Sequence, residues 1–452
     1  MSTSFLIFIV LSAVALLLFM VLKLKISAFV SLLITAIYVG IVSGMPLKDV
    51  TTAIQNGMAG TLGFVATVVG LGAIFGQMLE SSGGAESLAH HLVKKFGTDR
   101  ATWAMVITGF IVAIPVFFDV GFIILVPIVY ALSRDTKKSL LYYGIPLLAG
   151  LAATHSFIPP TPGPVAVADI INVQLGWVIL LGLIVGFPTA VIAGPVWGKF
   201  ISKKIYLEPP TEFLINKKQT IDTSKLPSFG LIALIIAVPL FLILVNTFTS
   251  LVVQKEIVQQ SILTDTMEFL GHPFTALIIA TLIAIYFLGI KRGFDKKEIL
   301  DLSTKALGPA GIIILITGAG GVLKQVLVDS GIGKIMAESM ANSALPPILL
   351  AWILAAIVRV TQGSSTVAMI TAAGIIAPVL SEFNLSDPQR ALVVLSIASG
   401  ATILSHVNDS GFWLVGKYFG MNEKQTLQSW TVMETLIAVC GLIFTMLTSL
   451  FF

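Results

Sequence analysis

Charged and polar side chains interrupt several long apolar stretches of this sequence, and these are the residues that could perform chemistry. Arg359 offers a planar guanidinium group that matches a carboxylate, so it predicts either an acidic ligand or an internal ion pair with Asp119 or Asp409. A carboxylate in a lipid environment is costly unless it is paired or protonated. Asp119 is therefore a candidate proton carrier, a partner of Arg359 or a member of a structural ion pair, and Asp409 is a second candidate for the proton.

A cluster of hydroxyl groups follows a glycine in the segment VTQGSSTVA, residues 360–368. The glycine permits a turn, and the residues after it can begin a returning helix as N-cap residues. These hydroxyl groups either bind a hydroxylated ligand or bond only to their own helix. In the first case, the predicted binding residues of this segment are Gly363, Ser364, Ser365 and Thr366.

Two further segments contain helix breakers and one histidine each. The stretch THSFIPPTPGP, residues 154–164, holds four prolines within six residues and cannot remain helical. The stretch LSHVNDSGFW, residues 404–413, holds turn-forming residues inside an apolar segment. A lone histidine in a membrane is often a packing group, but two histidines at related positions favour a shared site. The predicted binding residues of these two segments are His155, Ser156, Pro160, Thr161, Gly163, His406 and Asn408.

Cofactor and metal chemistry find little support in the sequence. The single cysteine, Cys440, excludes a disulfide framework and a cysteine-based metal cluster. Two histidines and two aspartates on four separate segments lack the ligand spacing of a zinc site, which stays a weak alternative. The net charge of +4 arises readily from membrane topology, so we expect no nucleic-acid partner. For the reasons above, we also expect no cofactor and no metal.

The composition indicates that membrane-spanning helices position these residues. Hydrophobic residues make up 56% of the 452 residues and charged residues only 11%, and the mean hydropathy is +0.98. A helix needs roughly 20 mostly apolar residues to cross a hydrocarbon core about 30 Å thick. Glu80, Lys324 and Glu434 fall near the ends of such stretches, where their side chains could reach the membrane surface. The predicted spans are approximately 5–22, 27–44, 60–80, 177–198, 228–247, 272–290, 308–328 and 430–451.

An internal repeat predicts how the spans are arranged. GAIFGQMLESSG at 72–83 matches GGVLKQVLVDSG at 320–331, and later pairs such as His155 and His406 hold nearly the same offset. We therefore predict an all-α polytopic membrane protein with two inverted repeats, each with about five transmembrane helices, a re-entrant hairpin and a broken helix at the midplane. The first repeat is predicted at 1–198, with its hairpin at about 101–133 and its broken helix at about 139–171. A cytoplasmic linker follows at 199–227. The second repeat is predicted at 228–452, with its hairpin at about 346–380 and its broken helix at about 391–416.

The distribution of Lys and Arg predicts the orientation of the chain. If the linker 199–227 is cytoplasmic, most of the 27 basic residues fall in inside loops, as the positive-inside rule requires. Basic loops of one half then correspond to loops poor in basic residues in the other half, as expected for inverted halves. Both termini are predicted to lie on the periplasmic or extracellular side.

Broken helices that meet near the midplane between inverted halves are typical of secondary transporters. Non-helical backbone at this depth survives only where it lines a cavity inside the protein. A channel would need a continuous polar pore, whereas the polar groups here concentrate at one depth. A membrane-embedded enzyme would need an oriented nucleophile and base or a metal cluster, and the sequence contains neither pattern.

Four motifs together resemble the gluconate:proton symporter (gluconate permease, GntP) family of the ion-transporter superfamily: GGVLKQVLVDSG, HSFIPPTPGP, GSSTVAMITAAGIIAP and SHVNDSGFW. The resemblance extends over essentially the whole chain. It implies proton-coupled uptake of gluconate or a related sugar acid, driven by the proton gradient, in the plasma (inner) membrane of a bacterium. It also implies homodimers and an elevator-like alternating-access movement. Relatives carry D-serine, fructuronate or glycerate-like acids, so the resemblance leaves the preferred carboxylate open.

These arguments together predict one pocket at the midplane for a polyhydroxy carboxylate. Hydroxyl and amide side chains would match the hydroxyl groups of the ligand, while Arg359 and the N-termini of the hairpin helices would hold its carboxylate. The co-transported proton could reside on Asp119, on Asp409 or on a histidine. Asp119 is the favoured carrier, although the family is expected to have Glu at that position.

Overall fold

The computed structural model describes residues 3–210, 226–332, 345–380 and 382–452, and the regular secondary structure within these residues is helical. This confirms the predicted all-α polytopic class. Seven helical stretches of the described chain are long and apolar enough to cross a membrane. They are Leu47–Ser81, Leu140–Ile171, Leu175–Lys204, Phe229–Gln254, Pro273–Arg292, Lys296–Asp329 and Glu423–Ser449, and shorter apolar helices accompany them.

The first half of the chain forms helices that match the predicted spans and interrupted segments in order. They are α1 (Thr3–Leu22), α2 (Ala28–Val42), α3 (Leu47–Ser81), α4 (Gly84–Phe96), α5 (Ala101–Val112), α6 (Phe118–Thr136), α7 (Leu140–Phe157), α8 (Pro162–Ile171), α9 (Leu175–Val191), the π-helix η1 (Ile192–Val196) and α10 (Trp197–Lys204).

The described helices of the second half follow a similar order, with a short helix, α13, added between α12 and α14 and without a described counterpart of α4. Its helices are α12 (Phe229–Gln254), α13 (Ile262–Gly271), α14 (Pro273–Ala284), η3 (Ile285–Gly289), η4 (Ile290–Arg292), α15 (Lys296–Asp329), α17 (Pro347–Gln362), α18 (Ser365–Leu380), α19 (Asp387–Gly400), α20 (Ser410–Phe419), α21 (Glu423–Thr426), the π-helix η5 (Leu427–Thr431) and α22 (Val432–Ser449).

Two helices are longer than the spans predicted at 60–80 and 308–328. Helix α3 begins at Leu47 and α15 begins at Lys296, because their first turns are polar and lie outside the apolar stretch that a hydropathy search detects. A capping box starts α15: Asp295 Oδ1 accepts a hydrogen bond from the Glu298 N–H at 2.7 Å, and Glu298 Oε2 accepts one from the Asp295 N–H at 2.8 Å. These polar starts extend both helices without adding apolar residues.

Each of the four interrupted segments contains two helices separated by a non-helical break. The breaks are 113–117 between α5 and α6, 158–161 between α7 and α8, 363–364 between α17 and α18, and 401–409 between α19 and α20. The predicted linker at 199–227 begins inside α10, whose last turn carries Lys203 and Lys204, and its residues 211–225 lie outside the described part of the chain.

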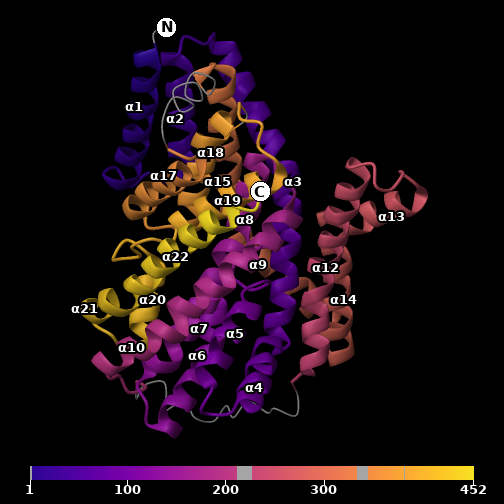
Figure 1. Ribbon diagram of the computed structural model, residues 1–452, viewed down its shortest axis with the longest axis vertical. Coiled ribbons are helices and arrows are strands. Elements are labelled where there is room, and N and C mark those ends of the chain that lie inside the picture. The colour runs from indigo at the N-terminus through magenta and orange to yellow at the C-terminus, as the bar shows by residue number, and fades with distance from the viewer. Residues whose placement is uncertain (1–2, 211–225, 333–344, 381) are drawn as a thin grey trace.

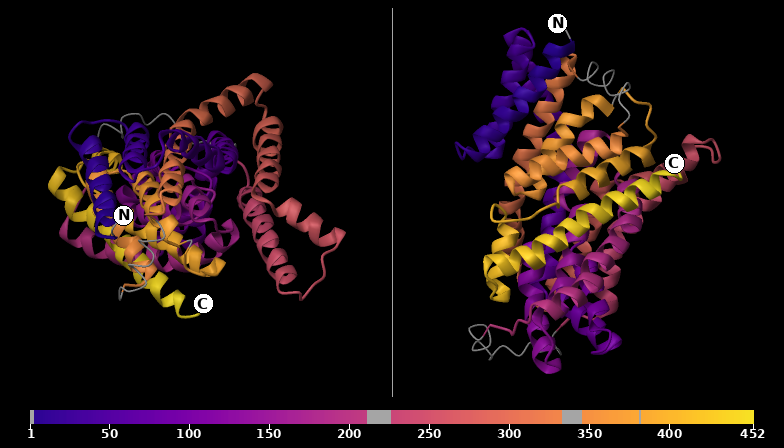
Figure 2. Two further views of the ribbon diagram at one scale, coloured as in Figure 1. Left: turned by 90° about the horizontal axis from the view of Figure 1, so that it is seen from above. Right: turned by 60° about the vertical axis from the view of Figure 1, so that its left-hand side comes forward.

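The two hairpin-forming helix pairs lie toward opposite ends of the molecule. Helices α5 and α6 lie toward one end of the long axis and α17 and α18 toward the other (Figure 1). The group α12 to α14 stands at one side of the body, and α1 and α2 lie at the opposite side, as the left-hand view of Figure 2 also shows. The inverted relation of the two halves and the re-entrant course of the hairpins stay predictions.

Glycines allow helices of the body to approach closely. A Cβ atom on Gly109 in α5 would lie 2.4 Å from the carbonyl oxygen of Leu147 in α7, and a Cβ atom on Gly150 would lie 2.3 Å from the carbonyl oxygen of Val106. The missing side chains therefore let α5 and α7 pack backbone against backbone, as small residues do between membrane helices. This packing holds α7, and with it His155, against the first hairpin.

We expect Gly109→Ala to destabilise the folded protein by about 1–3 kcal/mol, because the added methyl group would press on the Leu147 carbonyl. Gly60→Ala is the control, because a Cβ atom at Gly60 meets nothing within 4 Å. Thermal unfolding of the purified protein in detergent should show a lower midpoint for Gly109→Ala only. Equal midpoints for both variants would contradict the close approach of α5 and α7.

Candidate functional site

A cavity of about 710 Å³ lies where the breaks between the helices meet. Its wall is formed by α6, α7, α15, α17, α18, the start of α20 and the region around the start of α22. Many of the residues predicted to form a site line this cavity, although they come from distant parts of the sequence. They are Asp119, His155, Ser156, Arg359, Gly363, Ser364, Ser365, Thr366, Asn408 and Asp409.

The two breaks of the second half interlock. Gly363 has a φ of +81°, and a Cβ atom there would lie only 2.2 Å from the carbonyl oxygen of Asn408. The Asn408 amide donates a hydrogen bond from Nδ2 to the Val360 carbonyl at 3.0 Å, and Nε2 of His406 lies 3.0 Å from the same oxygen. The carbonyl groups left open at the end of α17 are thus bound by side chains of the 401–409 break.

The N-terminus of α18 faces the cavity with its hydroxyl groups. Ser364 Oγ accepts a hydrogen bond from the Val367 N–H at 3.4 Å and so caps its own helix. Ser365 Oγ is buried and has no hydrogen-bond partner among the described residues. Because the N-terminus of a helix carries partial positive charge and free N–H groups, this end of α18 favours an anion.

An ion pair joins the two breaks at the cavity wall. Arg359 Nη2 donates to Asp409 Oδ2 at 2.6 Å, and only 3% of the Arg359 side chain is exposed. The same carboxylate also accepts from Ser405 Oγ at 2.5 Å and from the Gly411 N–H at 3.1 Å. Trp430 Nε1 in turn donates to Ser405 Oγ at 2.6 Å. Asp409 is therefore fixed as the partner of Arg359 and as the cap of α20.

The guanidinium of Arg359 still has hydrogen-bonding capacity for a ligand. Its Nε and Nη1 atoms are buried and have no partner among the described residues, and both polar atoms of the neighbouring Gln362 side chain are in the same condition. A buried polar group without a partner costs about 1–3 kcal/mol, and more when it is charged. A carboxylate that accepted hydrogen bonds from Arg359 would remove this cost.

The first half contributes groups that are less constrained. Asp119 lies in the first turn of α6, is exposed in the single chain, and makes no hydrogen bond or ion pair with any described residue. The Nδ1 atom of His155 is buried without a described partner, and its ring meets Phe117 edge-on with 6.3 Å between the centroids. The sequence left open an ion pair between Asp119 and Arg359. The structure does not contain this pair, because Arg359 pairs with Asp409.

Four predicted residues lie outside this cavity. Pro160 and Thr161 border a separate hollow of about 10 Å³, and Thr161 Oγ1 donates to the Ile158 carbonyl at 2.6 Å. Gly163 faces Met369, whose Sδ would lie 2.7 Å from an added Cβ atom. His406 contacts the end of α17, as described above. The structure thus gives these four residues packing and bracing contacts, and their predicted role in binding stays a prediction.

Sequence analysis missed Glu434 as a cavity residue. The prediction that it reaches the membrane surface from a helix end is wrong, because α21 and η5 extend the helix before α22 and place residue 434 in its interior. Glu434 is 4% exposed and lines the cavity beside Trp430 and Arg359. The only signal in the sequence was a carboxylate four residues into a predicted span.

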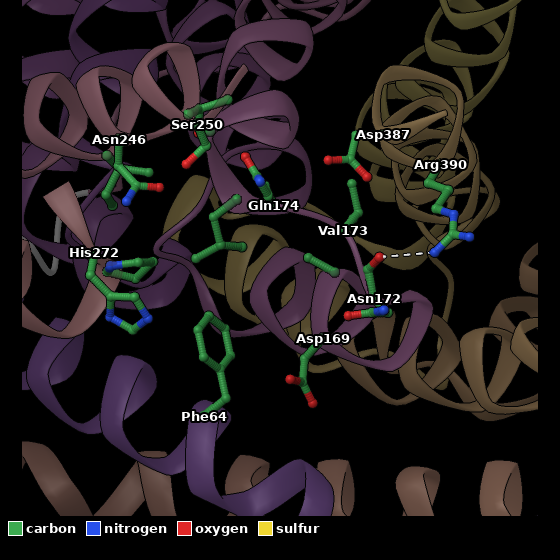
Figure 3. Close-up of a pocket in the computed structure, with 16 residues that line it drawn as sticks. Phe64, Asp169, Asn172, Val173, Gln174, Asn246, Ser250, His272, Asp387 and Arg390 are labelled. Carbon is green, nitrogen blue, oxygen red and sulfur yellow. Dashed lines mark hydrogen bonds between the residues drawn. The ribbon is translucent and has the colours of Figure 1, made fainter. Parts of the chain in front are cut away.

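A second cavity, of about 530 Å³, lies at the junction of α8 and α9 with α12, α14 and α19 (Figure 3). Its one arginine is already bound by backbone: Arg390 donates to the carbonyl groups of Asn172 and Leu385, each at 3.2 Å. Among the described residues that line the second cavity, no side chain has a buried polar atom without a hydrogen-bond partner. We therefore take the first cavity as the candidate site.

Neither cavity is built like a metal centre. Within the described residues, no group of three or more His, Cys, Asp or Glu side chains is placed to hold a metal ion. The first cavity instead combines one arginine, three carboxyl groups, hydroxyl groups and amides. This chemistry suits a hydroxylated organic anion.

Comparison with protein families identifies the chain. The model described as GntP family permease matches residues 5–451. The chain belongs to this family of permeases. As a GntP family permease it is a multi-pass membrane transport protein and not an enzyme, and the family suggested by the sequence motifs is confirmed.

Curated relatives match this permease over nearly their full length. It is 42% identical to a gluconate permease of Pseudomonas aeruginosa over 95% of this chain and 94% of that one. It is 41% identical to a low-affinity gluconate transporter of Escherichia coli K12, with 98% of each chain covered. It is also 38% identical to the Gnt-II system L-idonate transporter of Escherichia coli K12, over 96% of this chain and 97% of that one.

Solved structures share the fold of this permease at low sequence identity. The YdaH transporter of Alcanivorax borkumensis aligns with a TM-score of 0.66 at 13% identity, over 94% of this chain and 98% of that one. MtrF of Neisseria gonorrhoeae, which is described with a class of antimetabolite efflux pumps, aligns with a TM-score of 0.62 at 13% identity, over 88% of this chain and 83% of that one. These similarities establish the fold.

We expect Gly363→Ala to disrupt the site, because the new methyl group would meet the Asn408 carbonyl in addition to the strain of a positive φ. The matched control is Gly293→Ala, which has a φ of +91° but no atom within 4 Å of the added Cβ. Left-handed strain alone costs roughly 1–2 kcal/mol, and the contact should add about 1–3 kcal/mol. Thermal unfolding should therefore show a larger loss for Gly363→Ala, and equal losses would contradict the interlocked breaks.

Proposed function

We propose that this GntP family permease is a secondary active transporter that takes up gluconate or a related sugar acid together with protons across the bacterial plasma (inner) membrane. The observation that carries the proposal is the state of Arg359: one donor of its guanidinium binds Asp409, while Nε and Nη1 are buried beside the cavity without a described partner. The names of the gluconate-transporting relatives support the same substrate class.

In this proposal the carboxylate of the substrate binds Arg359 and the N-terminus of α18. Charge-assisted hydrogen bonds from the guanidinium donors that Asp409 does not occupy would fix its orientation. Ser365, Gln362 and Asn408 would then hydrogen-bond the hydroxyl groups of the sugar acid, because they line the same cavity. Ser364, Thr366, His155 and Ser156 complete the polar wall on either side.

The proton site proposed from the sequence is Asp119. Asp409, the other sequence candidate, already accepts hydrogen bonds from Arg359, Ser405 and Gly411, and protonation would weaken that arrangement. Asp119 has no such partner among the described residues and lies at the cavity. It is therefore freer to gain and lose a proton during transport.

Alternating access is proposed to follow from two inverted halves that move in an elevator-like manner within a homodimer. The repeated order of helices in the two halves supports this proposal, as do the interrupted segments that meet at one cavity. In the proposed orientation both termini lie on the periplasmic side and the linker is cytoplasmic.

Uptake of labelled gluconate into proteoliposomes tests this function directly. We expect accumulation that increases with an inward proton gradient, saturable counterflow and recovery of unaltered gluconate. D-serine and fructuronate should be included as competitors, because stronger competition by either would reassign the preferred carboxylate. Linear, non-saturable flux would indicate a channel and would overturn the carrier mechanism.

Arg359→Lys should weaken gluconate binding by about 1.5–3 kcal/mol, which corresponds to roughly 10- to 150-fold, because lysine cannot donate in a planar fork. Arg390→Lys is the matched control, since Arg390 lines the second cavity and is bound by backbone carbonyls. The Michaelis constant for uptake measures the effect. An unchanged constant in Arg359→Lys, or a larger change in Arg390→Lys, would place the substrate elsewhere.

Asp119→Asn should abolish accumulation driven by a proton gradient while leaving exchange of gluconate across the membrane. The reason is that an amide cannot carry the proton but retains the shape of the side chain. Asp169→Asn, in the second cavity, serves as the control and should accumulate gluconate as the unmodified protein does. Undiminished uphill uptake by Asp119→Asn would refute its role as proton carrier.

A further inference from the structure

Glu434 is a buried carboxyl group whose role nothing above explains. It is 4% exposed, it lines the central cavity, and its carboxyl oxygens make no hydrogen bond or ion pair with any described residue. A carboxylate this deep needs a partner, a proton or a function.

The position of Glu434 is fixed by the same break that holds Asp409. Thr431 Oγ1 donates to the Ser405 carbonyl, and Thr435 Oγ1 accepts from the Leu404 N–H at 3.4 Å. The π-helix η5 (Leu427–Thr431) directly precedes this turn, and such irregular turns are frequent at functional sites. The backbone that carries Glu434 is therefore anchored beside the Arg359–Asp409 pair.

The charges that face Glu434 come from four elements. Arg359 on α17 attracts its ionised form, and Asp409 in the break before α20 repels it. Asp119 on α6 and His155 on α7 line the same cavity from the first half. Helix α19 also packs against α22 and carries Asp387 and Arg390, but both of these line the second cavity. Helix α9 and the π-helices η1 and η5, which pack against α22 as well, carry no titratable side chain.

The charge balance of the cavity sets up a competition. Arg359 is the only Lys or Arg among the described residues that line it, and Asp409 already engages one of its donors. Ionised Glu434 is the nearby negative group that the free donors of Arg359 would attract. A substrate carboxylate would need the same donors and would meet repulsion from Glu434 at the same time.

We infer that Glu434 binds a proton when the substrate carboxylate binds Arg359, so that neutralisation of Glu434 admits the anion to the cavity. This inference rests on the proposed function and deepens it, because it links proton binding to substrate binding, whereas Asp119 is proposed to act in proton-driven accumulation. The proton comes from the aqueous phase and forms a bond to one carboxyl oxygen of Glu434. The substrate remains an anion and no other bond changes.

Equilibrium binding of gluconate to the purified protein, measured by calorimetry across mildly acidic to mildly alkaline pH, tests the inference. The unmodified protein should take up protons on binding, seen as a dependence of the binding heat on the buffer. Its apparent dissociation constant should rise by up to about tenfold per pH unit once Glu434 is ionised in the free protein. Glu434→Gln should bind with little dependence on pH and without that proton uptake.

Glu80→Gln is the matched control, since Glu80 is a partly buried glutamate that accepts from Gln77 Nε2 at 3.0 Å outside the cavity, and it should bind as the unmodified protein does. Glu434→Asp keeps a carboxyl group and should restore the pH dependence. Persistent pH dependence in Glu434→Gln would overturn the inference while leaving gluconate transport intact. If Glu434→Gln does not fold, the unmodified protein still tests the inference. Gluconate binding without proton uptake by the unmodified protein would overturn it.

No gluconate binding by the unmodified protein at any pH would overturn the proposed substrate and the inference together. This outcome differs from pH-independent binding, which overturns the inference alone. The two failures are therefore distinguishable in one series of measurements.

Discussion

The ion pair between Arg359 and Asp409 is the interaction on which the candidate site depends. It joins the end of α17 to the break that leads into α20, and Ser405, Trp430 and the Gly411 N–H extend it into a network. Removal of one partner from a buried pair typically costs about 3–5 kcal/mol, because the other charge is left uncompensated. This is a large part of the roughly 5–15 kcal/mol by which proteins are stable. The pair also sets the number of guanidinium donors that remain for a ligand.

The two halves contribute to the site unequally despite their similar order of helices. The second half supplies a braced wall, in which His406 and Asn408 bind the Val360 carbonyl at the end of α17. The first half supplies Asp119 and the Nδ1 atom of His155, which lack partners among the described residues. This difference fits a division in which the second half holds the anion, while Asp119 from the first half and Glu434 from the second are the groups proposed to change their protonation.

Many of the residues that line the first cavity could be predicted from the sequence, because helix breakers and polar groups inside apolar segments are strong local signals. Arg359, Asp119, Asp409 and the hydroxyl groups after Gly363 were found in this way, and all line one cavity. The choice of partner could not be read from the sequence, because Arg359 had two aspartates available and only the fold selects between them.

The predictions from the sequence that differ from the structure also have physical causes. Glu434 was misread because hydropathy places a helix end where apolar residues end, whereas α21 and η5 continue the helix through polar residues. The starts of α3 and α15 were missed for the same reason. Pro160, Thr161 and Gly163 were grouped with the site because they break the helix, but a break can also serve close packing, as the contact of Gly163 with Met369 illustrates.

The contact between Gly363 and the Asn408 backbone limits which parts of the molecule can shift relative to one another. With no side chain between them, the tip of the second hairpin and the 401–409 segment have no space to slide. In the proposed alternating-access movement, the two segments would therefore travel together as one unit. The hinges of that movement would lie beyond these two segments, in the connections that enter and leave the unit.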